Sequence, residues 1–291
     1  MTYCGRFAPS PTGPLHFGSL VAAVGSWVRA RAQNGIWLVR MEDLDPPREV
    51  PGAAADILVT LAAFGMESDQ PVLYQSQRDP GYRDAFERLQ ISAQVFPCWC
   101  SRSDLDAQAR LHHGVCIAPA DPARAPAWRL HTPDMTIGFN DLALGPQSQN
   151  LRDAAGDFAI KRVEGWYAYQ LAVVVDDASQ GITEIVRGAD LLDSTARQIY
   201  LQRLLGYATP NYLHLPLVLN ASGQKLSKQD RALPVDRNDP LPALRAALEF
   251  LELHCDGTRA NVDALLAAAV ADFDLGRLAR ISRSLTTIGP S

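Results

Sequence analysis

The sequence alternates short apolar runs with longer segments in which apolar residues recur at helical spacing. Residues 2–8, 36–42 and 71–77 form the apolar runs, and residues 17–35 and 55–65 carry the helical spacing. A buried parallel strand is nearly continuously apolar, and a helix between two such strands makes them parallel. The order strand, helix, strand, helix, strand therefore predicts a doubly wound α/β fold, with Gly35 as the expected end of the first helix.

The later part of the chain interrupts this pattern and then resumes it. Residues 92–162 read as an insertion, with strand-like pieces at 135–140 and 157–162. The α/β pattern returns in the segments 169–177, 182–192, 194–206 and 212–219. Ser194 is the expected N-cap of the helix over 194–206, and Gly206 its stop. We expect four units: two halves of one nucleotide-binding domain at 1–91 and 163–235, the insertion at 92–162, and a small helical subdomain at 236–291.

Two short motifs carry residues suited to a nucleotide. "PSPTGPLHFG" spans residues 9–18, in the first β-to-α turn, where doubly wound folds bind nucleotides. His16 lies near a helix N-terminus and can donate to phosphate oxygens, and Gly18 leaves space for adenine. In "KLSKQ", residues 225–229, Lys225 and Lys228 can bind a triphosphate and Ser227 can add a hydroxyl donor. Each motif alone is modest evidence for a nucleotide site, because a Pro/Gly turn before a helix usually has no ligand and lysines in a loop are usually solvated.

Together and in this order, the two motifs resemble the paired signatures of class I aminoacyl-tRNA synthetases. The form "PSPTG-x-LH-x-G" resembles the glutamyl/glutaminyl branch, as do "VVVDD", "GITEIVRGADLL", "STARQ" and "HLPLVL". The resemblance covers residues 3–232. It implies a Rossmann-type catalytic domain that activates an amino acid with ATP and Mg²⁺, and it makes Lys228 the main ATP lysine.

The same resemblance implies a pocket for glutamate. By family position its residues are Arg6, Ser10, Glu42, Tyr169 and Arg187. Arginine suits a substrate with two carboxylates because its planar fork donates two parallel hydrogen bonds. Glu42 would take the ammonium group. Which arginine takes which carboxylate stays open.

The chain ends about 60 residues after "KLSKQ", too early for the region with which full-length glutamyl-tRNA synthetases read the anticodon. This architecture resembles the glutamyl-Q tRNA(Asp) synthetases, truncated paralogues that activate glutamate without tRNA. They transfer it to the queuosine base in the anticodon loop of tRNA(Asp), which we therefore expect as partner. Two alternatives are a short glutamyl-tRNA synthetase acting on the tRNA 3′ end and a non-catalytic, synthetase-derived regulator. Intact His16, Gly18, Lys225 and Lys228 disfavour the regulator.

A cysteine cluster within the predicted insertion suggests a metal. Cys98 and Cys100 are two residues apart, and His112 precedes Cys116 by four. Three thiolates and one imidazole make a closed tetrahedral set for a single structural zinc ion, whereas buried free thiols are the plainer reading. The resembled subfamily often has tyrosine at the position of His112, and the neighbouring His113 is a rival ligand.

Composition adds limits rather than detail. A chain of 291 residues with 47% hydrophobic and 20% charged residues can build an ordinary globular core. It has no apolar run long enough for a bilayer and no secretion signal, so we expect a cytoplasmic protein without a membrane partner. A monomer is favoured. The net charge of −5 is only weak evidence against an RNA partner, since one face can still be basic.

Overall fold

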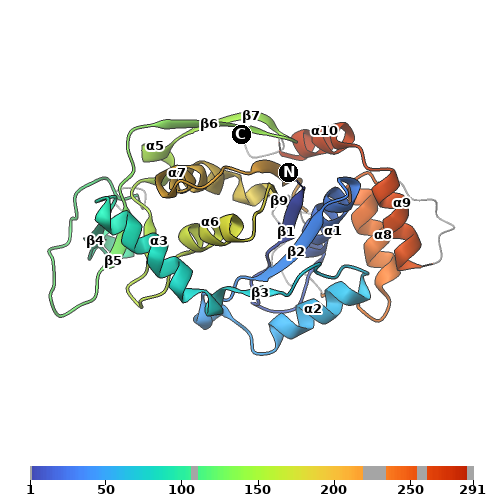
Figure 1. Ribbon diagram of the computed structural model, residues 1–291, viewed down its shortest axis with the longest axis horizontal. Coiled ribbons are helices and arrows are strands. Elements are labelled where there is room, and N and C mark those ends of the chain that lie inside the picture. Colours follow the sequence, from blue (N-terminus) through green and yellow to red (C-terminus); the bar gives the residue numbers. More distant parts are fainter. Residues whose placement is uncertain (1, 106–110, 219–233, 254–260, 287–291) are drawn as a thin grey trace.

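A computed structural model describes residues 2–105, 111–218, 234–253 and 261–286 (Figure 1). Its centre is a set of parallel strands, as the apolar runs predict. β1 (Cys4–Phe7), β2 (Ile36–Met41) and β3 (Leu73–Tyr74) form one sheet in the order β1-β2-β3. A second sheet has the order β7-β6-β10-β9 and contains β9 (Glu184–Gly188), β10 (Asn211–Leu215), β6 (Thr136–Asp141) and β7 (Gly145–Asn150).

The two sheets adjoin along β1 and β9. The Thr183 amide, just before β9, donates to the Cys4 carbonyl of β1 at 2.9 Å. From this seam the chain runs outward in both directions, to β2 on one side and to β10 on the other. Such a point of reversal leaves a crevice at the carboxyl ends of the strands, which is where open α/β sheets bind ligands.

Helices cover both faces of the sheets and bury two separate cores. One face packs against α1 (Phe17–Ala32), α2 (Ala53–Ala63), α8 (Pro240–Phe250) and α9 (Val262–Ala271). The other packs against α3 (Asp79–Ile91), α6 (Tyr169–Ser179) and α7 (Thr195–Leu205). Along β2, Trp37 and Val39 belong to the first core and Leu38 to the second. Because alternate side chains enter opposite cores, these strands are apolar at nearly every position.

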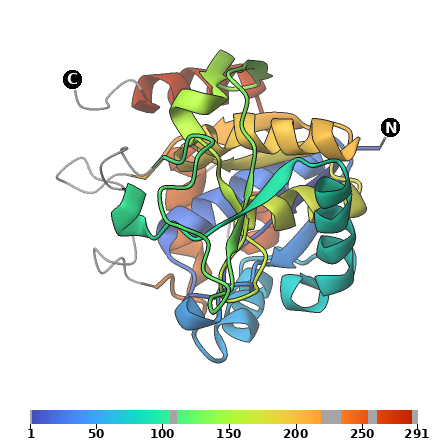
Figure 2. The same ribbon diagram turned by 90° about the vertical axis from the view of Figure 1, so that its left-hand side faces the viewer.

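The segment 92–162 contributes to two places. β4 (Val95–Cys98), β5 (Ala127–Leu130) and β8 (Ala159–Lys161) form a small antiparallel sheet, with α4 (Arg102–Leu105) beside it in the chain. This sheet lies at the end of the molecule opposite α8 and α9 (Figures 1 and 2). The β6–β7 hairpin of the same segment instead extends the second sheet, since Asp141 of β6 pairs with Tyr212 of β10. α5 (Leu151–Ala155) follows the hairpin, and α10 (Leu275–Thr286) ends the described chain.

Several local expectations need correction. The run 71–77 is a strand only at residues 73–74, because Gln75 turns inward to donate to buried Asp176 at 2.9 Å. α1 ends at Ala32 rather than at Gly35, and Asn34 takes the left-handed conformation with φ of 49°. Gly35 serves a different need: a Cβ there would lie 2.7 Å from the Tyr3 carbonyl oxygen.

The helix over 194–206 is confirmed in place, with one change at its start. α7 closes at Gly206, whose φ of 68° suits glycine. Ser194 precedes the helix but makes no capping bond, and its hydroxyl accepts from the Gln170 side chain at 3.1 Å. Among the described residues, none of the helices is both long enough and apolar enough to span a membrane.

Candidate active site

An open cavity of about 990 Å³ lies at the carboxyl ends of β1, β2 and β9. Its wall contains all seven residues predicted for ATP or glutamate that fall within the described chain: Arg6, Ser10, His16, Gly18, Glu42, Tyr169 and Arg187. They come from positions up to 181 residues apart, between Arg6 and Arg187. The fold therefore collects the nucleotide motif and the predicted glutamate residues around one space, while their individual roles stay predictions.

His16 is the N-cap of α1 and lines the cavity. Its Nδ1 accepts from the Ser19 amide at 3.3 Å, so the proton of the neutral ring is on Nε2. Nε2 lies 3.1 Å from the Ser19 hydroxyl. An N–H donor at a helix N-terminus is a suitable partner for a phosphate group.

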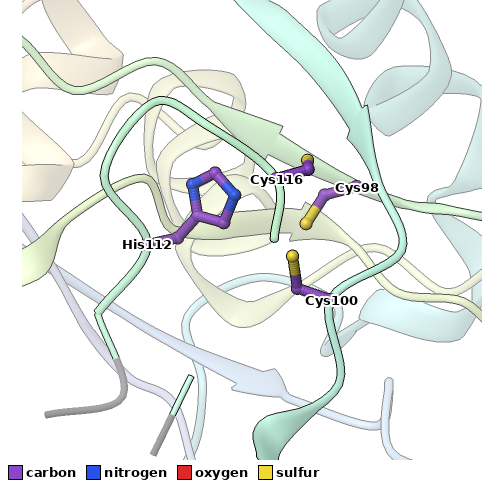
Figure 3. A group of neighbouring side chains, drawn as sticks. All are labelled: Cys98, Cys100, His112 and Cys116. Atoms are coloured by element: carbon purple, nitrogen blue, oxygen red, sulfur yellow. The ribbon is translucent and has the colours of Figure 1, made fainter. Parts of the chain in front are cut away.

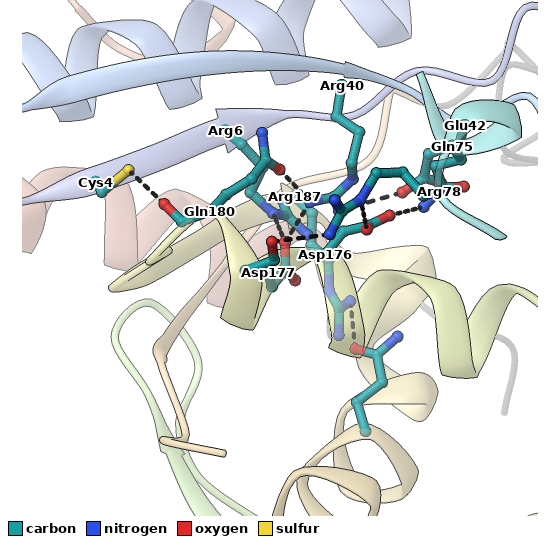
Figure 4. Close-up of polar contacts among 12 residues, drawn as sticks. Cys4, Arg6, Arg40, Glu42, Gln75, Arg78, Asp176, Asp177, Gln180 and Arg187 are labelled. Atoms are coloured by element: carbon teal, nitrogen blue, oxygen red, sulfur yellow. Dashed lines mark hydrogen bonds and ion pairs between the residues drawn. The ribbon is translucent and has the colours of Figure 1, made fainter. Parts of the chain in front are cut away.

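Arg6 and Glu42 of the cavity wall belong to a buried charge network whose members come from three elements (Figure 4). Asp177 of α6 accepts from Arg6 of β1 at 3.0 Å and from Arg40 of β2 at 2.7 Å. Arg40 also reaches the Gln180 side chain at 2.8 Å and Glu42 at 3.4 Å. Burial raises the pKa of Glu42, against the lowering effect of Arg40 and Arg6. The Glu42 carboxylate is largely buried at the cavity wall, and among the described residues its side chain has one long contact, to Arg40, so it is well placed to take a cation.

Arg187 of β9 is held differently, by neutral groups. It donates from Nε to His214 at 3.1 Å and from its two terminal nitrogens to Gln198 and Thr195, both at 2.8 Å. His214 lies in β10, beside Arg187 in the sheet register, and Gln198 and Thr195 lie in α7. Tyr169, the first residue of α6, lines the same part of the cavity.

The second nucleotide motif lies outside the described residues, so Lys225, Ser227 and Lys228 have no described position. The described residues on either side of that segment are at the cavity. Val218 lines the wall, and Pro234 forms a β-bridge with His16. The Val235 amide donates to the Leu15 carbonyl at 3.1 Å.

The predicted metal ligands also come together (Figure 3). Cys98, Cys100, His112 and Cys116 place one donor atom each within 4.8 Å of one another. His113 is exposed and does not belong to this group. His112 Nδ1 lies 2.9 Å from an Asp157 oxygen, while its buried Nε2 has no hydrogen-bond partner among the described residues. A buried, unpartnered imidazole nitrogen beside three thiols is the donor arrangement that a tetrahedral zinc ion needs.

Sequence reasoning left several residues of these sites unassigned. Arg40 stands inside the apolar run 36–42, and a charge in a buried strand was the available signal for a buried partner. Asp177 belongs to "VVVDD", a motif that supports the family resemblance but does not by itself assign a role to this aspartate. Asp141 and His214 gave no such signal, because they meet only through the pairing of β6 with β10.

Replacing Asp177 with asparagine should destabilise the protein by about 3–5 kcal/mol at pH 7, because two buried arginines lose their counter-charge. Burial would raise the pKa of Asp177, but Arg40 and Arg6 hold it below the usual value. A carboxyl with a lowered folded-state pKa stabilises above its unfolded pKa of about 4 and loses this effect as pH falls. Urea titrations should therefore give a difference between wild type and Asp177→Asn that shrinks below about pH 4.

The matched control is Asp56→Asn, which removes the exposed Asp56–Arg237 pair and should cost at most about 1 kcal/mol. Equal stabilities of wild type and Asp177→Asn at pH 7 would contradict the proposed contribution of the buried network to the free energy of unfolding.

Comparisons with known proteins agree with this geometry. Residues 4–248 match the family described as tRNA synthetases class I (E and Q), catalytic domain. A glutamyl-Q tRNA(Asp) synthetase of Burkholderia cenocepacia is 56% identical over 281 residues, covering 92% of this chain and 94% of that protein. One from Xanthomonas campestris pv. campestris is 54% identical over 284 residues, covering 97% and 95%.

Solved structures show the same fold. A glutamate tRNA ligase from Elizabethkingia meningosepticum, in complex with its amino acid, matches with a TM-score of 0.79 at 24% identity. The match covers 96% of this chain and 66% of that one. A glutamate-tRNA synthetase from Elizabethkingia anophelis gives a TM-score of 0.77 at 25% identity. With the family match across most of its length and relatives above 50% identity, the chain belongs to the catalytic-domain family of class I glutamyl and glutaminyl tRNA synthetases.

Proposed function

We propose that this chain activates glutamate with ATP and transfers it to the queuosine base at the wobble position of tRNA(Asp). The observation that carries the proposal is the pair of buried arginines, Arg6 and Arg187, lining one cavity with the largely buried carboxylate of Glu42. Glutamate has two carboxylates and one ammonium group, so its charges complement this set. The relatives at 54–56% identity are named as glutamyl-Q tRNA(Asp) synthetases, which supports the same activity.

Activation joins a glutamate carboxylate oxygen to the α-phosphorus of ATP, and pyrophosphate leaves. The transition state gathers negative charge, so the site needs N–H donors and cations more than a protein nucleophile. His16 offers Nε2–H beside the N-terminus of α1, and Gly18 lines the wall where adenine would lie. Lys225, Ser227 and Lys228 would bind the triphosphate, which brings its own Mg²⁺.

Transfer then breaks the mixed anhydride. A hydroxyl oxygen of the queuosine cyclopentenediol attacks the glutamyl carbonyl carbon, AMP leaves, and the hydroxyl proton can pass to the departing phosphate. Sequence-specific RNA recognition favours unpaired loops whose bases can be splayed out, and an anticodon loop is such a target. Because the terminal ribose of tRNA is also a vicinal diol, a short glutamyl-tRNA synthetase acting at the 3′ end is the alternative function. We further propose that the protein is a monomer and that it acts in the cytoplasm, where ATP, glutamate and tRNA are all available.

We expect glutamate-dependent pyrophosphate exchange in the absence of any tRNA. Labelled glutamate should then pass to tRNA(Asp) that contains queuosine and not to an unmodified transcript, because the transcript lacks the cyclopentenediol. Nuclease digestion of the product should place the label in an anticodon-loop fragment.

Label on the 3′-terminal adenosine of tRNA(Glu) would instead favour the short glutamyl-tRNA synthetase. A protein without pyrophosphate exchange would leave the synthetase-derived regulator as the better function.

Either Arg6→Ala or Arg187→Ala should reduce glutamate-dependent exchange at least tens-fold. A substrate carboxylate left unpaired in a desolvated pocket costs about 2–5 kcal/mol of binding. Lys228→Ala should instead mainly weaken the use of ATP and slow adenylation. Steady-state KM values for glutamate and ATP separate the two effects, and circular dichroism checks the fold. Near wild-type exchange in both arginine variants would contradict the proposed glutamate pocket.

We also propose that Cys98, Cys100, His112 and Cys116 hold one structural zinc ion. The Asp157 carboxylate accepts from His112 Nδ1–H, so Nε2 is the nitrogen left to coordinate. Arg129 of β5 donates to Cys98 Sγ at 3.2 Å and would partly offset the negative charge of three thiolates. Zinc would fix β4 and the chain near residue 116 to each other.

Elemental analysis of protein purified without a histidine tag should find about one zinc per chain. His112→Ala should lower that content and the melting temperature, because the fourth ligand is lost. His113→Ala, one residue away and exposed, is the matched control and should keep the zinc. Wild-type protein that contains no metal and still has the full activity and melting temperature of the zinc-containing protein would rule the site out.

A further inference from the structure

A buried chain of hydrogen bonds leads from the β6–β7 hairpin to Arg187. His214 Nδ1 lies 2.6 Å from Asp141 Oδ2, and Arg187 Nε donates to His214 Nε2 at 3.1 Å. The three side chains come from the adjacent strands β6, β10 and β9. Relative exposure is 1% for Asp141, 0% for His214 and 5% for Arg187. Asp141 and His214 are behind Arg187, because neither contributes to the cavity wall.

The bonding fixes the tautomer of His214. A guanidinium has only donors, so Nε2 of His214 must be an acceptor without a proton. The ring proton is then on Nδ1, where it is donated to Asp141. Burial and the nearby Arg187 lower the pKa of His214 despite the opposing effect of Asp141, which is consistent with a neutral ring.

The same bonds leave part of Arg187 free for a ligand. Of its five N–H groups, three are used by His214, Gln198 and Thr195. The other two, on the terminal nitrogens of a side chain that lines the cavity, have no partner among the described residues. Within the described part of the chain, no carboxylate forms an ion pair with Arg187, whereas Arg6 is paired with Asp177. Arg187 therefore retains its charge for a negative group in the cavity.

We propose that His214, held in one neutral tautomer by Asp141, is a positioning residue that fixes Arg187 for a substrate carboxylate. The inference rests on the proposed binding of glutamate by Arg187. It makes the β6–β7 hairpin part of the amino-acid site, although no residue of the hairpin lines the cavity.

Asp141→Asn is the sharpest test because the backbone fixes which way the new amide must face. Asp141 Oδ1 accepts from the Ala143 and Leu144 amides at 3.0 and 2.8 Å. The asparagine oxygen must keep these bonds, so its NH₂ group would face His214 Nδ1. His214 would then carry its proton on Nε2, facing the N–H of Arg187. Two donors cannot bond to each other, so Arg187 should lose its orientation although Arg187 itself is not replaced.

In glutamate-dependent pyrophosphate exchange, Asp141→Asn should raise the KM for glutamate by about 10–100-fold, the loss expected of one or two buried charged hydrogen bonds. The KM for ATP should change less than about twofold, because the proposed ATP site uses His16, Gly18 and Lys228 rather than Arg187. The matched control is Asp134→Asn, an exposed carboxylate just before β6, which should change neither value.

Two further measurements separate positioning from general damage. In an Arg187→Lys background, Asp141→Asn should add little to the glutamate KM, since the effect passes through the arginine. His214→Phe should raise the KM for glutamate as much as Asp141→Asn does. His214→Gln should raise it less, because the amide oxygen can accept from Arg187. The ¹⁵N spectrum of the histidine rings should show the His214 proton on Nδ1 in wild type and on Nε2 in Asp141→Asn.

Normal wild-type exchange with an unchanged glutamate KM in Asp141→Asn would overturn the positioning role alone. Equal rises in the KM for glutamate and ATP would also overturn it, in favour of a merely structural role. Wild-type protein without glutamate-dependent exchange would overturn the proposed function, and this inference with it.

Discussion

The ion pairs of Asp177 with Arg6 and Arg40 are the constraint on which the rest of the site depends. They bring one carboxylate of α6 against two neighbouring strands, β1 and β2, in a region closed to water. Removing one partner from such a network leaves an uncompensated buried charge, so the three residues must be placed together. Because β1 leads into the His16 turn and β2 into Glu42, this placement also sets the cavity wall.

The two arginines of the cavity differ in how their charge is balanced. Arg6 shares Asp177 with Arg40, so much of its charge is met within the protein. Arg187 is supported by a neutral histidine, an amide and a hydroxyl, and has no carboxylate partner among the described residues. A dicarboxylate in this space would therefore meet one compensated and one uncompensated arginine. The difference arises from the neighbouring strands and helices, since both residues lie in buried parallel strands.

Two aspartates of the segment 92–162 each hold a histidine ring in the same way. Asp157 binds Nδ1 of His112, and Asp141 binds Nδ1 of His214. In each pair the carboxylate fixes the ring proton on Nδ1 and presents Nε2 as the acceptor or ligand atom. At His112 that atom faces three thiols, and at His214 it faces an arginine. One segment thereby supports both the Cys–His cluster and the proposed amino-acid site.

The sequence by itself determined the fold class, the nucleotide motif and the cysteine cluster. These depend on local patterns: apolar alternation, a turn before a helix, and ligands only a few residues apart. The residues named for glutamate followed from resemblance, and the fold brings all of them to one cavity. Only the tertiary structure decided how Arg6 and Arg187 are balanced, and which ring nitrogen of His112 and His214 carries the proton. Those answers depend mainly on contacts between residues 27 to 171 positions apart in the chain, which no local pattern encodes.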